Sequence, residues 1–132
     1  MMNETIIDKE IDPDELWALV QKKGVIKMKI VSDSMEPVIL KGDIVSVTKY
    51  TGFEPNKIVV FFHDKKRICH YLVNQYPDKM YETSSLKKPF HFDSVIYEKQ
   101  IIGEIGKHVT ILDVFKAKLR FIIKKVSFTY DD

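Results

Sequence analysis

The stretch that decides the fold is residues 31–47, Val-Ser-Asp-Ser-Met-Glu-Pro-Val-Ile-Leu-Lys-Gly-Asp-Ile-Val-Ser-Val. Ser34 ends an alternating apolar segment, and Pro37 follows three residues later. Because a proline ring fixes its own φ and keeps the preceding residue out of the helical region, the backbone after Ser34 is restricted. A nucleophile needs such a fixed position. Gly42-Asp43 then leads into a second alternating segment, so the stretch predicts a strand, a stiff turn and a strand.

The composition is that of one soluble globular domain. A chain of 132 residues, 45% apolar and 30% charged, suits a single core. The net charge of +2 is too small to indicate a nucleic-acid partner. The single cysteine, Cys69, excludes an internal disulfide and fits a reducing compartment. The sequence shows neither a secretory signal nor about 18 consecutive apolar residues, so we expect a cytoplasmic protein without a membrane-spanning helix.

The expected elements are mostly short strands. Residues 1–11 are expected to form a flexible arm. Asp12 is typical of a helix N-cap and Pro13 of a first helical position, which predicts a helix over about 13–22. Strands are expected at 25–31, 43–49, 58–62, 67–74, 80–83 and 101–106, with a loop at 84–94 and a terminal helix at 110–126. This order predicts a mainly β, coiled barrel-like domain over residues 12–132, with a helix at each end.

The terminal helix is amphipathic. Its apolar stripe comprises Ile111, Leu112, Phe115, Leu119, Ile122, Ile123 and Val126, and its basic face comprises Lys116, Lys118, Arg120, Lys124 and Lys125. Two interpretations stay open. The stripe packs on the barrel and leaves the lysines in solvent, or the helix lies on an anionic membrane surface as a peripheral contact.

The serine stretch resembles the nucleophile motif of the signal peptidase I and LexA-like serine peptidases. Their pattern reads S-M-x-P-x-[IL]-x-x-G-D-x-V-x-V, and every specified position is met here. The resemblance covers roughly residues 25–107 and implies a coiled all-β fold that binds a peptide or protein substrate. It implies that Ser34 is the nucleophile and that the structural positions of the motif are Met35, Pro37, Gly42 and Asp43.

The same resemblance assigns the base. Residues 68–73, Ile-Cys-His-Tyr-Leu-Val, are similar to the "I-V-H-R-V-I" strand of archaeal and endoplasmic-reticulum signal peptidases, which use histidine. His70 is therefore the predicted base, although Tyr71 replaces the family arginine. The alternative for His70 is a strand histidine that bonds a backbone carbonyl. The rival base is Lys66, which we expect at a solvated hairpin tip, where a lysine pKa stays near ~10.4.

A third group would hold the histidine tautomer. In histidine-type relatives, aspartates that follow a "T-K-G-D" segment do so, but here Ser84-Ser85-Leu86 replaces Lys-Gly-Asp and the first aspartate is missing. Asp93 falls at about the spacing of the second. The alternative is that Asp93 caps a loop turn.

The oxyanion of the reaction needs preorganised donors. The resemblance implies the backbone N–H of Ser34 and the side-chain hydroxyl of Ser32. The alternative for Ser32 is a bond to the turn backbone. Asp33, which replaces a common glycine, is expected to face solvent, because a carboxylate would oppose the oxyanion.

Other chemistry is not indicated. The four histidines and one cysteine lack metal-ligand spacing, so we expect no metal site and no cofactor. Cys69 should point to the strand face opposite His70, which argues against a Cys–His dyad. The predicted function is a serine endopeptidase that cleaves a small precursor or leader peptide through Ser34 and His70. The alternative is a catalytically inactive peptide-binding module of the same fold, favoured by the altered segment at 84–86.

Overall fold

The computed structural model describes residues 6–7, 11–87 and 92–130, without the side chains of 92–94, 121 and 124–130. The strands and α-helices are, in chain order, β1 (Ile6–Ile7), α1 (Pro13–Lys23), β2 (Val25–Lys29), β3 (Ile44–Thr48), β4 (Lys57–His63), β5 (Lys66–Tyr76), β6 (Met80–Ser84), β7 (Phe92–Tyr97), β8 (Ile101–His108) and α2 (Ile111–Tyr130). A short 3-10 turn at Glu98–Gln100 joins β7 to β8. The predicted mainly β class is confirmed.

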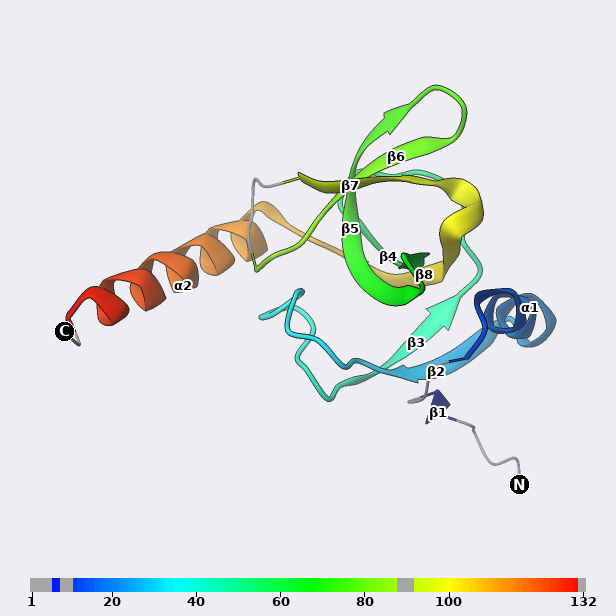
Figure 1. Ribbon diagram of the computed structural model, residues 1–132, viewed down its shortest axis with the longest axis horizontal. Helices are drawn as coiled ribbons and strands as arrows, with labels where there is room; N and C mark the ends of the chain where they lie inside the picture. Colours follow the sequence, from blue (N-terminus) through cyan, green and yellow to red (C-terminus); the bar gives the residue numbers. More distant parts are fainter. Residues whose placement is uncertain (1–5, 8–10, 88–91, 131–132) are drawn as a thin grey trace.

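The strands form one strongly curved sheet in the order β1-β2-β3-β8-β4-β5-β6-β7 (Figure 1). All neighbouring strands are antiparallel except β1, which runs parallel to β2. Strand β8 lies between β3 and β4 and joins the first three strands to the other four. The turn that carries Ser34, between β2 and β3, belongs to the first group, and His70 on β5 belongs to the second.

The first helix begins and ends where its capping residues predict. The Asp12 carboxylate accepts a hydrogen bond from the Glu15 N–H at 3.3 Å, and Pro13 is the first helical residue. Gly24, with φ of 78°, ends the helix and donates its N–H to the Val20 carbonyl. The expected arm needs correction at residues 6–7, because they form β1 and the Ile7 side chain is buried.

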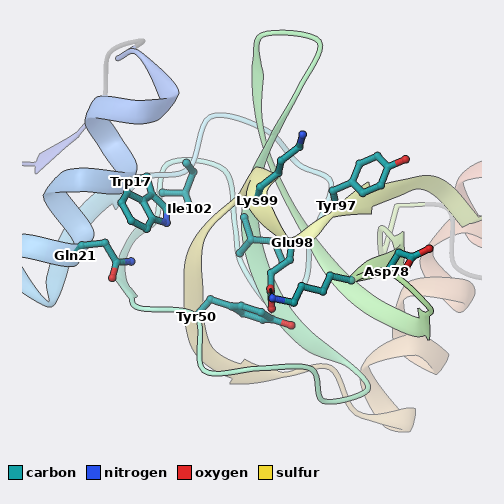
Figure 2. A pocket seen from close by; sticks show the side chains of 10 residues that line it. Trp17, Gln21, Tyr50, Asp78, Tyr97, Glu98, Lys99 and Ile102 are labelled. Atoms are coloured by element: carbon teal, nitrogen blue, oxygen red, sulfur yellow. Dashed lines mark ion pairs between the residues drawn. The ribbon is translucent and has the colours of Figure 1, made fainter.

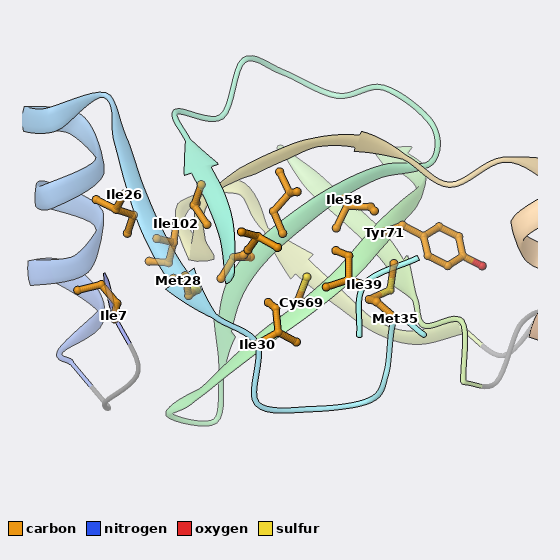
Figure 3. Packing of buried hydrophobic residues seen from close by; sticks show 14 of the residues in the cluster. Ile7, Ile26, Met28, Ile30, Met35, Ile39, Ile58, Cys69, Tyr71 and Ile102 are labelled. Atoms are coloured by element: carbon orange, nitrogen blue, oxygen red, sulfur yellow. The ribbon is translucent and has the colours of Figure 1, made fainter. Parts of the chain in front are cut away.

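The continuous apolar run in β4 is buried because its side chains alternate between two hydrophobic clusters, one on each face of the strand. Ile58 and Val60 belong to one cluster of buried side chains, whereas Val59 and Phe61 belong to another on the opposite face. All four are completely buried, as expected of a strand covered on both faces. Figure 3 shows the first cluster, in which Met35, Ile39, Cys69 and Tyr71 lie together.

Two predicted connections differ from the structure. The loop expected at 84–94 is wrong at its two ends, because Ser84 is the last residue of β6 and 92–94 belong to β7, which pairs with β6 from Met80↔Tyr97 to Ser84↔Phe92. Residues 88–91 of that expected loop lie outside the described part of the chain. The hairpin tip is Asp64-Lys65, both with positive φ, so Lys66 is already the first residue of β5. Phe92–Tyr97 has no apolar alternation, so neighbouring strands rather than its own pattern determine its conformation.

A buried ion pair fixes the start of β4. The Lys57 side chain is 2% exposed, and its Nζ lies 3.2 Å from Oε1 of Glu104 on β8. The same ammonium donates to the Gly52 carbonyl at 2.7 Å and to Thr51 Oγ1 at 3.0 Å. A buried lysine needs such partners, because an unpaired charge in the core is costly. The pair therefore holds the 49–56 connection against β8.

Candidate active site

The serine turn joins β2 to β3 and is closed at its base by two backbone hydrogen bonds. Ile30 N–H donates to the Asp43 carbonyl and Gly42 N–H to the Ile30 carbonyl, both at 2.8 Å. The Asp43 carboxylate accepts the Leu40 N–H at 2.9 Å. Gly42 has φ of 94°, a conformation that glycine adopts without steric cost. The Glu36–Pro37 peptide bond within the turn is cis.

A second segment, residues 86–87, fixes the backbone of Ser34 through hydrogen bonds. The Ser34 carbonyl accepts the N–H groups of Leu86 at 2.9 Å and Lys87 at 3.1 Å. Leu86 is 1% exposed and packs in the same core cluster as Met35, the residue after the serine. The serine is therefore held by its own turn and by a segment more than fifty residues away. These partners carry no sequence signal, because any residue with a backbone N–H could supply them.

The Ser34 hydroxyl lies on the free edge of β5. It donates to the Cys69 carbonyl at 3.2 Å, and Ser32 Oγ lies 3.2 Å from Ser34 Oγ. Among the described residues, β6 pairs with β5 only from Tyr71 onwards, which leaves this edge open to the serine turn. Since the Cys69 carbonyl belongs to the peptide bond that leads into His70, the hydroxyl is one peptide unit from the predicted base.

His70 is half-buried, and its ring stands edge-on to Phe61 at 5.9 Å between centroids and 75° between planes. Between the described residues Ser34 and His70, no hydrogen bond joins hydroxyl to ring. A serine hydroxyl carries one hydrogen, so donation to the ring would replace donation to the Cys69 carbonyl. Catalytic hydrogen bonds often form only when substrate is bound.

Cys69 offers no competing nucleophile. Its side chain lies in the first core cluster, and burial raises the pKa of its thiol to about 12. The thiol is therefore protonated at neutral pH, and only a thiolate would be nucleophilic.

The other residues considered for the site either lie away from the Ser34 hydroxyl or have a side chain outside the described part of the chain. Asp33 pairs with Lys87 Nζ at 3.1 Å on the surface. Lys66 is exposed on the hairpin. Asp93 lies on β7 by its backbone, and its side chain is outside the described part of the chain. Within that part, the Ser34 N–H makes no hydrogen bond.

The sequence model described as Peptidase S24-like matches residues 1–107. The chain belongs to the Peptidase S24-like family. No curated protein matches the chain.

The described part of this Peptidase S24-like chain has other surface features away from Ser34. A pocket of about 640 Å³ lies between α1 and the turn that follows β7 (Figure 2). Its lining includes Trp17, Tyr50, Glu98 and Lys99 and none of the candidate site residues named above. Among the described residues, no three His, Cys, Asp or Glu side chains gather to hold a metal ion. No described helix is long and apolar enough to cross a bilayer.

Proposed function

We propose that the protein is a serine endopeptidase in which Ser34 is the nucleophile and His70 the general base. One observation carries the proposal: the Ser34 hydroxyl is hydrogen-bonded to the carbonyl of the peptide that leads into His70, at the open edge of β5. The serine turn, the buried core and the 86–87 segment together hold the backbone of Ser34 in place. A nucleophile needs this kind of preorganisation.

The proposed chemistry follows from these positions. The Ser34 proton passes to the His70 ring as Oγ bonds to the substrate carbonyl carbon. The negative oxygen is stabilised by the Ser34 N–H, which has no other partner in the described part of the chain, and by the Ser32 hydroxyl. His70 then protonates the leaving amine, and water releases the acyl group by the reverse steps. Asp93 orients the ring in this proposal.

The proposed substrate is an extended segment of a small precursor or leader peptide. It adds as a strand beside the open edge of β5, so its backbone supplies affinity. A narrow cleft of about 20 Å³ lies between the end of β2 and β5, beside Ser32 and Cys69. The resemblance to the signal peptidases implies a small side chain near the scissile bond.

The test is labelling with a fluorophosphonate probe together with cleavage of a peptide library. We expect Ser34→Ala and His70→Ala each to remove nearly all turnover, with the double variant little worse, because the pair acts as one unit. His63→Ala is the matched control, since this half-exposed histidine lies on the same hairpin. Activity should rise with pH through about 6.5, and a rise at clearly higher pH would indicate a lysine base instead.

The second candidate is a peptide-binding module without turnover. It is favoured by Leu86, which stands in place of a family aspartate and is buried in the core, so no carboxylate is available there. Peptide binding by the wild-type protein without cleavage or probe labelling would support the module and contradict the peptidase.

A further inference from the structure

Helix α2 presents its apolar side chains outward. Ala117 is buried in the first core cluster and Val114 packs against this cluster, so this face of the helix is turned toward the core. At 3.6 residues per turn, the apolar stripe occupies an arc of about 120° on the opposite side. The described side chains of this arc are all exposed: Ile111 89%, Phe115 63%, Leu112 59%, Ile123 54%, Leu119 48% and Ile122 46%. The interpretation that the stripe packs on the barrel is therefore wrong.

The helix is held in this orientation at its inner end. Thr110 and Asp113 cap it reciprocally, each donating its backbone N–H to the side chain of the other. Arg120 lies 3.7 Å from Glu36 of the serine turn. The helix therefore docks beside the candidate active site, and the rest of it extends away from the sheet (Figure 1).

The charge distribution of α2 indicates which kind of partner binds the apolar arc. The helix carries five basic residues and one acidic residue, whereas the whole chain has a net charge of only +2. The remainder of the chain is thus net acidic, and the positive charge is concentrated on the helix. Lys116 and Lys118 are exposed and lie at opposite borders of the apolar arc by helical position.

We infer that α2 is a docking surface for an anionic lipid membrane, in which it lies parallel to the interface with its apolar arc in the acyl boundary. An apolar face bordered by lysines is complementary to lipid tails below anionic headgroups. A second copy of the chain suits the arc less well, because two such helices face to face would bring lysine borders together. The membrane would then lie next to the serine turn.

The test is co-sedimentation of the full chain with vesicles of phosphatidylcholine alone or mixed with phosphatidylglycerol. We expect binding to the anionic vesicles and release when salt is raised from ~0.1 M to ~1 M, which shortens the Debye length from ~10 Å to ~3 Å. Lys116→Gln/Lys118→Gln should weaken binding about 25-fold, at roughly fivefold per lysine. Lys22→Gln/Lys23→Gln, on the exposed last turn of α1, is the charge-matched control.

The apolar contribution is tested separately. Phe115→Ser removes an exposed side chain, so folding should be unchanged while vesicle binding falls roughly tenfold or more. Trp17→Ser, at an exposed site on α1, should bind as the wild type does. Equal recovery with neutral and anionic vesicles would overturn the inference. A dimer seen by sedimentation velocity and abolished by Phe115→Ser, without vesicle binding, would assign the arc to a second copy. The assay measures no cleavage, so its outcome is independent of the peptidase proposal.

Discussion

Replacing Lys57 by methionine is expected to destabilise the protein by about 3–5 kcal/mol, the cost of breaking a buried ion pair. Methionine keeps most of the buried apolar stem but removes the ammonium. Among the described residues, the Glu104 carboxylate, whose side chain is 13% exposed, then keeps only its hydrogen bonds from Thr51, at 2.6 Å from N and 2.8 Å from Oγ1. The Gly52 carbonyl also loses its 2.7 Å donor. The uncompensated carboxylate dominates the cost.

The assay is urea denaturation followed by circular dichroism. With a slope of about 2 kcal/mol per molar urea, the midpoint should fall by about 2 M. In the double variant Lys57→Met/Glu104→Gln, the orphaned charge is gone, so about 1–3 kcal/mol should return. Lys49→Met removes an exposed lysine from the same connection and should stay within about 0.5 kcal/mol of wild type. A loss below 1 kcal/mol for Lys57→Met, or a double variant less stable than that single one, would refute the reasoning.

Two further predictions concern the sheet. Gly103→Ala should cost about 1–3 kcal/mol by calorimetry, because its Cβ would collide with the Thr48 carbonyl and lie 2.7 Å from Val47 Cγ1. Gly106→Ala, where a Cβ meets nothing within 4 Å, is the control, and equal losses would contradict the steric argument. For Cys69, the folded-state pKa of about 12 exceeds the reference value of 9.0, so the unfolded chain ionises first. Stability should therefore fall as pH rises from about 9 to 12, by up to about 4 kcal/mol, and an equally steep fall in Cys69→Ala would exclude this cause.

The sequence predicted those elements whose pattern is local. The serine turn was recognisable because Pro37 restricts the backbone where it stands and Gly42 permits the positive φ that the turn needs. The β4 run was recognisable because a strand covered on both faces is apolar at every position. The ends of α1 followed from Asp12 and Gly24, whose effects reach only one turn.

The remainder depends on partners distant in the chain. Nothing near Lys57 indicates burial, because Glu104 is 47 residues away. The clamp on Ser34 comes from backbone groups of Leu86 and Lys87, which leave no trace in side-chain type. The apolar stripe of α2 was visible, but periodicity does not tell which face a helix turns toward the core. In α2, the small residue Ala117 is buried against the core, whereas the larger side chains of the stripe are exposed.

The position of β8 has a consequence for the order in which the molecule is made. Ser34 precedes β3 and His70 lies on β5, and the two groups of strands are joined in the sheet through β8 alone among the described pairings. A chain growing from the ribosome therefore carries both side chains long before residues 101–108 have emerged to bring them together. Non-local pairing of this kind folds slowly. In the proposed peptidase, proteolytic competence would then arrive only after β8 has been made, which would keep a chain without β8 from cutting its neighbours.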